Sequence, residues 1–154
     1  MANRLVRLNP VTAATSTPDA GAAFNKTNVQ PILGLADGAG ICIDKSENMY
    51  VCDYTKHVIY RYRKGDTQSY IFAGAYGQSG NVDGAYSVAR FNQPSSICVD
   101  NSGNLYLIDS GNLLIRRIDQ NANVTTVASI PAASGQTGGI AVDASGNIYF
   151  MDSL

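Results

Sequence analysis

Few side chains in this sequence have the chemistry for catalysis or metal binding. There is one histidine, three cysteines and twelve acidic residues. A metal site or an acid–base pair needs several such groups to converge. His57 is the single histidine, and no serine nucleophile elbow or phosphate-binding loop occurs. We therefore predict no catalytic residue, no metal ligand and no cofactor, so the chain is predicted not to be an enzyme.

Many of the carboxylates belong to a phrase that occurs three times. It reads ICIDKSENMYVCD at 41–53, ICVDNSGNLYLID at 97–109 and IAVDASGNIYFMD at 140–152. Each copy has the pattern of a strand, a tight turn and a second strand. Asp44, Asp100 and Asp143 close the first strand, where a short carboxylate accepts bonds from backbone N–H groups two or three residues later. Turn formation thus accounts for these carboxylates, and we favour it over metal binding.

The same turn contains a position that favours glycine. Gly103 and Gly146 are predicted to adopt a left-handed conformation, which glycine adopts without steric cost. The first copy has Glu47 at this position. We therefore expect strain or a different turn shape in the first repeat.

The cysteines occupy apolar columns of the repeat. Cys42 and Cys98 share one column with Ala141, and Cys52 shares another with Ile108 and Met151. A free cysteine behaves as a small apolar residue. An odd number without a C-x-x-C pair argues against both a disulfide framework and a zinc site. We predict three reduced, buried, structural thiols.

A basic and aromatic strip follows the first repeat. Such strips bind single-stranded nucleic acid by neutralising phosphates and stacking on bases. Strand alternation places the arginines and tyrosines on opposite faces, so a solvated strand face is the favoured interpretation. The strip comprises Lys56, Tyr60, Arg61, Tyr62, Arg63 and Lys64.

The composition indicates strands and turns with almost no helix. Eleven of the twelve acidic residues are aspartate, and there are 15 glycines. The net charge of −1 provides no field that would attract nucleic acid or an anionic membrane. No stretch approaches the roughly 20 apolar residues of a membrane span. The first residues lack the apolar core of a signal peptide, so we expect a cytoplasmic or virion-associated protein.

The repeat spacing predicts propeller blades. Asp44 and Asp100 are 56 residues apart, and Asp100 and Asp143 are 43 apart. Units of about 40 to 50 residues with several short strands are typical of propeller blades. Further strands are predicted at 58–62 and 69–73 in the first unit, and at 113–118 and 124–128 in the second.

The residues around the second unit resemble those of the NHL-repeat β-propeller family over 40–154. The resemblance rests on Gly74, Gly77, Gly80, Asp83-Gly84, Ala89, Phe91, Pro94, Ile97, Val99-Asp100, Gly103-Asn104-Leu105-Tyr106, Asp109, Asn112, Ile115-Arg116 and Ile118. It implies an all-β fold with four antiparallel strands per blade: two complete blades and a partial third, preceded by an extended N-terminal arm. Members of the family include enzymes, protein-binding and RNA-binding modules, and structural proteins. Its zinc lyases use several histidines, and lactonase relatives hold calcium with central carboxylates and an asparagine. Neither set is present here.

We expect an arm over residues 1–38 and blades over 39–154. Blade one with a long connection is expected at about 39–94, blade two at 95–138 and the start of blade three at 139–154. The arm is either a flexible terminus or an anchor that lies on a partner subunit. Its apolar residues, the predicted partner-binding set, are Leu5, Val6, Leu8, Ile32, Leu33 and Leu35.

The favoured function is a non-catalytic interaction or structural module in a larger, oligomeric protein assembly. The few Lys and Glu, the many Gly, Asn, Ser and Thr, and the arm also resemble phage virion proteins of the tail or capsid surface. One alternative is the N-terminal part of an NHL-family metal-dependent enzyme whose ligands lie beyond residue 154. A second alternative is an RNA-binding propeller, although nucleic acid is the less favoured partner.

Overall fold

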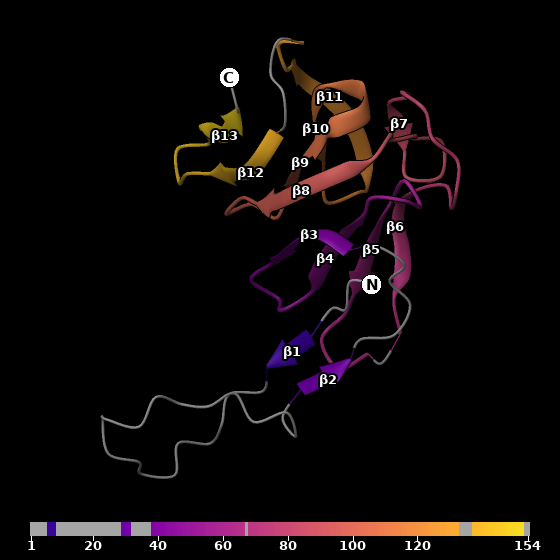
Figure 1. Ribbon diagram of the computed structural model, residues 1–154. Helices are drawn as coiled ribbons and strands as arrows, with labels where there is room; N and C mark the ends of the chain where they lie inside the picture. Colours follow the sequence, from indigo (N-terminus) through magenta and orange to yellow (C-terminus); the bar gives the residue numbers. More distant parts are fainter. Residues whose placement is uncertain (1–5, 9–28, 32–37, 67, 133–136, 153–154) are drawn as a thin grey trace.

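A computed structural model of the chain describes residues 6–8, 29–31, 38–66, 68–132 and 137–152 (Figure 1). These residues form antiparallel sheets, and their helical content is a short 3-10 turn, η2 (Ser110–Asn112). The predicted all-β class is confirmed. Among the described residues, no helix is both long enough and apolar enough to span a membrane.

Blade one is a sheet of four strands in chain order. The predicted strand at 58–62 has these bounds in the structure, and the one at 69–73 is shifted by one residue. The strands are β3 (Gly38–Ile43), β4 (Met49–Asp53), β5 (Val58–Tyr62) and β6 (Tyr70–Gly74).

Blade two has a fifth strand that the repeat does not indicate. β7 (Gly84–Ala85) lies in the long connection after blade one and pairs with the last strand of blade two. The sheet order is β7-β11-β10-β9-β8. The other strands are β8 (Pro94–Val99), β9 (Leu105–Asp109), β10 (Leu114–Ile118) and β11 (Asn123–Ser129).

Two further pairs of strands flank the complete blades. β12 (Thr137–Val142) and β13 (Ile148–Asp152) form the partial third blade. β1 (Val6–Leu8) and β2 (Val29–Pro31) pair with each other within the predicted arm. Of the arm residues singled out from the sequence, Val6 and Leu8 belong to β1. Leu5, Ile32, Leu33 and Leu35 lie outside the described residues.

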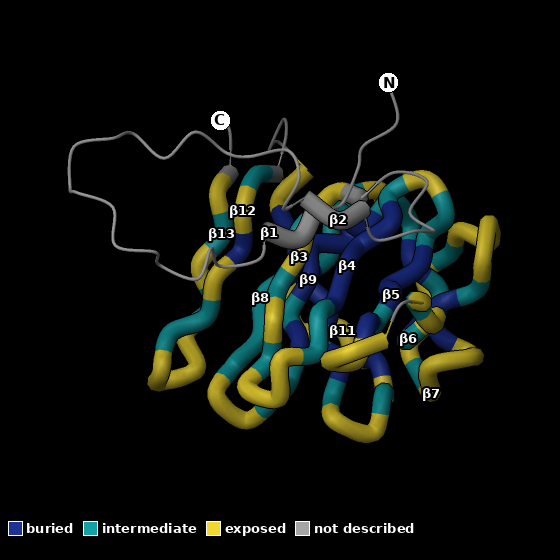
Figure 2. Tube along the Cα trace, turned by 90° about the horizontal axis from the view of Figure 1, so that it is seen from below, coloured by how far each residue is buried: buried dark blue, intermediate teal, exposed yellow. Residues whose placement is uncertain are grey.

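The blades pack face to face around their first strands. β3, β8 and β12 are neighbours on one side of the molecule, and the later strands extend away from them (Figure 1). Apolar side chains of one blade meet those of the next, as Cys52 and Ile59 of blade one do with Ile97 and Leu107 of blade two. Figure 2 shows the buried residues concentrated along β4, β5 and β9.

The left-handed positions predicted from the turn are confirmed. Gly103 and Gly146 both have φ of 84°, and Glu47 has φ of 61°. Glu47 therefore keeps the turn shape of its sister repeats, at a cost of about 1 kcal/mol for a residue with a Cβ. Its carboxylate lies 2.6 Å from Lys64 Nζ, with both side chains more than half exposed (60% and 67%).

Replacing Glu47 tests this strain. We expect Glu47→Gly to change the free energy of unfolding by between zero and about +1 kcal/mol, because relief of strain exceeds the loss of an exposed ion pair. Gly103→Ala, the matched control, should destabilise by about 1 kcal/mol. Urea denaturation measures both. Marked destabilisation by Glu47→Gly would show that the Lys64 contact outweighs the backbone strain.

Candidate functional site

The repeated aspartates organise the turns that border the candidate site. Asp44 Oδ1 accepts from the backbone N–H groups of Ser46 (2.9 Å) and Asn48 (2.8 Å). Its Oδ2 accepts from Asn48 Nδ2 (2.9 Å) and the Tyr50 hydroxyl (3.2 Å). Asp100 and Asp143 make the same four bonds in their own repeats. We call residues 44–48, 100–104 and 143–147 the Asp turns, and their chemistry agrees with the turn interpretation.

A fourth turn uses the same chemistry between β10 and β11. Asp119 Oδ1 accepts from the backbone N–H groups of Asn121 and Asn123, both at 2.9 Å. Ala122 takes the left-handed position, with φ of 60°. In an antiparallel sheet, alternate turns lie at the same end of the strands. This turn therefore lies at the same end of blade two as the turn at 100–104.

The Asp turns make the stability of the fold depend on pH. Partial desolvation raises the pKa of Asp100, but the hydrogen bonds from Asn104, Ser102 and Tyr106 outweigh it, and the net pKa is lowered from 3.8. A lowered folded-state pKa contributes stability that is complete above the unfolded value and is lost as pH falls through the folded value. We expect the thermal midpoint to hold between about pH 7 and pH 5 and to fall below about pH 4.

Asp100→Asn checks the source of this acid sensitivity. The variant should have a lower thermal midpoint than the wild type at neutral pH. Its midpoint should fall less on acidification, because the amide does not titrate. Asp66→Asn, on an exposed residue outside the Asp turns, is the matched control. An unchanged pH profile for Asp100→Asn would assign the acid sensitivity to other carboxylates. Thermal unfolding followed by circular dichroism measures all three proteins.

A pocket of about 320 Å³ lies between the Asp turns of blades one and two. Both turns supply polar walls, and the side chains of β4, β5 and β6 form its inner part. The lining residues are Asp44, Lys45, Ser46, Tyr50, Arg61, Phe72, Asp100, Asn101, Ser102, Gly103 and Gln120. Lys45 crosses the boundary between the blades, since its Nζ donates to the backbone carbonyl of Asn101 at 2.9 Å.

Arg61 is held against aromatic rings inside this pocket. Its guanidinium carbon lies 5.0 Å from the centroid of the Phe72 ring, and that ring packs edge-on against Tyr50 with centroids 5.0 Å apart. Arg61 Nε is buried and has no hydrogen-bond partner among the described residues, so the face of Phe72 is its compensating contact. Two cations, two carboxylates and two aromatic rings thus line one pocket, an arrangement that suits a polar ligand with both donors and acceptors.

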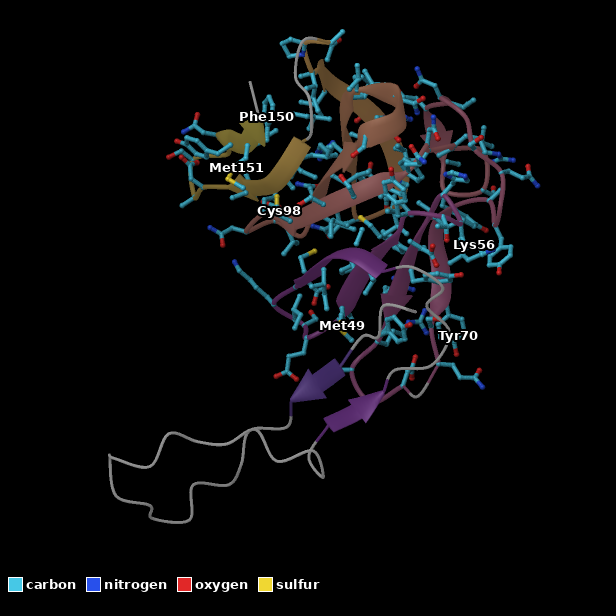
Figure 3. All side chains as sticks on the ribbon, in the orientation of Figure 1. Met49, Lys56, Tyr70, Cys98, Phe150 and Met151 are labelled. Carbon is cyan, nitrogen blue, oxygen red and sulfur yellow. The ribbon has the colours of Figure 1, made fainter. Side chains whose placement is uncertain are left out.

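The structure divides the basic and aromatic strip between two faces. Tyr60 and Tyr62 are buried against Val51 and Val58, whereas Arg61 lies in the inter-blade pocket. The other basic residues have separate surroundings: Lys56 lies 5.2 Å from the Tyr76 ring, Arg63 5.9 Å from the Tyr70 ring, and Lys64 pairs with Glu47 (Figure 3). The six residues do not form one continuous surface.

The thiols and the histidine have structural surroundings. Cys52 is fully buried in the inter-blade core, and Cys42 and Cys98 are half-buried at the edges of apolar clusters. All three are free, and burial raises the pKa of Cys42 to about 12 and that of Cys98 to about 11. His57 Nδ1 accepts the backbone N–H of Gln93 at 3.0 Å. In the described part of the chain, no three His, Cys, Asp or Glu side chains are grouped to hold a metal ion.

Sequence reasoning missed a buried ionic cluster in blade two. Arg116 and Asp109 are both fully buried, and Arg116 NH1 lies 2.8 Å from Asp109 Oδ2. The same guanidinium binds Asp83 at 2.7 Å and the Val82 carbonyl at 2.8 Å, both in the long connection. Asp83 in turn accepts from Thr126 of β11. These charges hold the connection against the blade.

The sheets are arranged radially, with their first strands next to one another and the apolar faces of successive sheets packed together. This arrangement defines a β-propeller. Residues 91–118 match the NHL repeat. An NHL repeat-containing protein 2 from Gallus gallus is 36% identical over 112 residues, which cover 71% of this chain and 15% of that protein. The chain belongs to the NHL-repeat family of propellers.

Solved structures share the propeller fold at lower identity. A chain of the nidogen/laminin complex matches with a TM-score of 0.64 and 18% identity, over 88% of this chain and 48% of that one. A virginiamycin B lyase from Staphylococcus aureus matches with a TM-score of 0.55 and 13% identity, over 75% and 34%. The chain thus spans less than half of the length of each of these three proteins.

Proposed function

We propose that this chain is a non-catalytic propeller module that binds a protein partner through the pocket between the Asp turns of blades one and two. The pocket carries the proposal. It places Arg61 and Lys45 beside Asp44 and Asp100, with Tyr50 and Phe72 as apolar surface. A polypeptide segment offers backbone donors and acceptors together with apolar side chains, and it therefore matches this mixed lining better than a strongly charged ligand does.

The propeller class supports this assignment. The nidogen/laminin complex joins a propeller of this fold to a protein partner. The lyase shows that the same fold also carries enzymes, so fold alone does not choose between the two. The carboxylates of the Asp turns and of the buried cluster already have hydrogen-bond partners within the chain, which favours a binding role. Membership of a larger assembly, including the virion suggested by the composition, remains a prediction.

Site-specific crosslinking tests the proposal. A photoreactive residue at Ser102, on the rim of the pocket, should join the chain to one defined polypeptide in its native cell. The same probe at the exposed Ser87, on the connection between β6 and β8, is the control and should not do so. Arg61→Gln should reduce the Ser102 product several-fold without unfolding the blades. Equal products from both positions, or a Ser102 product indifferent to Arg61, would contradict this function.

A further inference from the structure

The two carboxylates that line the pocket between blades one and two are occupied by their own turns. An ionised carboxylate has about four positions at which it accepts a hydrogen bond. Asp44 fills them with bonds from Ser46, Asn48 and Tyr50, since Oδ1 accepts two bonds and Oδ2 accepts two. Asp100 is filled in the same way by its own repeat. The acidic side chains of the pocket therefore have little acceptor capacity left for a ligand.

The two cations of the pocket, in contrast, keep unused donors. Lys45 Nζ uses one N–H group to bind the carbonyl oxygen of Asn101 at 2.9 Å, and its other N–H groups can serve a ligand. Among the described residues, no carboxylate forms an ion pair with Arg61, and its buried Nε has no hydrogen-bond partner. The interactions that the pocket leaves unmade are thus those of cationic donors, and an anionic acceptor would complete them.

Arg61 differs in this respect from its counterpart in blade two. Arg117 occupies the same position of the repeat, because each arginine pairs across the sheet with the tyrosine that follows the Asp turn. Arg117 donates to Asn104 Oδ1 at 2.8 Å. In the described part of the chain, no such bond joins Arg61 to Asn48, the equivalent asparagine. The arginine of blade two is engaged within its own blade, whereas the arginine of blade one is available to the pocket.

Phe72 provides a physical reason for this difference. It lies at the bulge of blade one, between the paired residues Ile71 and Ala73, and blade two has Val127 at the equivalent bulge. The guanidinium carbon of Arg61 lies 5.0 Å from the centroid of the Phe72 ring. Valine has no ring face, so only the bulge of blade one holds a guanidinium by a cation–π contact. A side chain that is already held in place loses less conformational entropy when a ligand binds.

The charges of the lining favour a ligand with a single negative group. Arg61 and Lys45 formally balance Asp44 and Asp100. The Tyr50 hydroxyl, which donates to Asp44 Oδ2 at 3.2 Å, lies within the field of both signs. Burial and then Asp44 raise the pKa of Tyr50, and Arg61 opposes that rise. One carboxylate can pair with Arg61, whereas a dianionic phosphate or a nucleic-acid backbone would be repelled by the two aspartates.

We propose that the pocket binds a carboxylate of the partner polypeptide, with Arg61 as the main donor and Lys45 as the second. This inference rests on the proposed polypeptide-binding function and adds the chemical group that the pocket selects. The carboxylate belongs to an Asp or Glu side chain or to a chain terminus, and either source offers the same oxygens. An arginine fork binds a carboxylate through parallel N–H···O bonds. Tyr50 and Phe72 supply apolar surface for the neighbouring atoms of the segment.

Crosslinking of short random peptides tests which group the pocket selects. The 154-residue chain with a photoreactive residue at Ser102 is irradiated with the peptide pool, and the peptides joined to it are sequenced by mass spectrometry. Two pools are compared, one with free C-terminal carboxylates and one with C-terminal amides. If the group is a side chain, the products of both pools should be several-fold enriched in Asp and Glu. If the group is a chain terminus, products should come from the free-acid pool alone.

Substitutions of the two equivalent arginines assign the selection to one side chain. Arg61→Gln should remove the preference for a carboxylate, and Arg61→Lys should retain part of it, because lysine keeps the charge but not the planar fork. Arg117→Gln is the matched control and should leave the preference unchanged. Near-ultraviolet circular dichroism checks that each variant is folded.

A change in the peptide tests the same contact without altering the protein. A selected peptide whose carboxylate is replaced by an amide should bind the wild-type chain about tenfold or more weakly, because it loses a charge-assisted hydrogen bond. The same replacement should have little effect on binding to Arg61→Gln, since the partner of the carboxylate is already absent. Fluorescence anisotropy of labelled peptides measures the affinities.

The outcomes separate this inference from the function on which it rests. Peptide products at Ser102 that do not exceed those at the Ser87 control would overturn both. Products at Ser102 without a preference for a carboxylate would overturn the inference and leave polypeptide binding in place. A preference that survives Arg61→Gln would also overturn it, because another group would then make the selection.

Discussion

Arg116→Ala is expected to lower the free energy of unfolding by about 3–5 kcal/mol. The substitution leaves Asp109, which is fully buried, without its counter-ion at 2.8 Å. It also removes the bonds to Asp83 and Val82 that hold the long connection in place. The Asn92 backbone N–H and Asn112 Nδ2 still donate to Asp109, each at 2.7 Å, but they carry no compensating positive charge. A buried carboxylate that loses its counter-ion costs more than the pair is worth, which is why the loss exceeds that of an ordinary hydrogen bond.

The adjacent arginine provides a matched control for this measurement. Arg117 is partly exposed and its guanidinium donates to Asn104 Oδ1 at 2.8 Å. Arg117→Ala should cost no more than about 1 kcal/mol. The double variant Asp109→Asn, Arg116→Met should be more stable than Arg116→Ala, because it removes the unpaired charge. Equal losses for the two single arginine variants in urea denaturation would show that Asp109 finds another partner.

Gly40→Val is expected to cost at least about 3 kcal/mol, beyond the usual range of overpacking. The new Cβ would approach Ser96 Cα at 2.7 Å, the Ser95 carbonyl oxygen at 2.8 Å and the Ile97 nitrogen at 3.0 Å. All three are backbone atoms of the neighbouring blade, so no side-chain rotation relieves the contact. β3 and β8 must separate, and the apolar cluster between Cys52 and Ile97 opens with them.

Gly139→Val is the matched substitution in the same column of the repeat. A Cβ at this position would meet no atom of the described residues within 4 Å, so the substitution should cost less than about 1 kcal/mol. Chemical denaturation of both variants measures the two losses. If Gly40→Val proved as mild as Gly139→Val, the close approach of the first strands would not be a determinant of blade packing.

The repeated thirteen-residue motif was sufficient to predict the blades, because each conserved position of the motif forms a contact with residues close to it in sequence. Asp100 closes a turn through bonds to residues two and four positions later, and such contacts are visible in a short window of sequence. The strand at 58–62 was predicted from its β-branched and aromatic residues, and four of its five residues are buried. Comparison with Gly103 predicted either strain or a different turn shape at Glu47, and the structure shows the left-handed conformation. Local chemistry and periodicity therefore account for the fold class.

Features that depend on distant contacts could not be predicted in the same way. β7 has two residues, too few for a periodic signal, and it forms because Gly84 meets Val124 across 40 residues of sequence. The Arg116–Asp83 contact spans 33 residues. The pocket lies between two turns that are separated by a whole repeat, so it exists only once the blades are packed.

The fifth strand of blade two changes which residues exchange their amide protons together. By sequence spacing, residues 75–93 belong to the first repeat, but the Arg116 cluster and the Asn112–Gly80 bond tie them to the second. Partial opening of blade two should therefore release the amides of Val82 and Thr126 at one common rate in deuterium exchange. The cooperative unit of this propeller would then be offset from its genetic repeat, so that an insertion between Gly74 and Gly84 disturbs the blade that follows it.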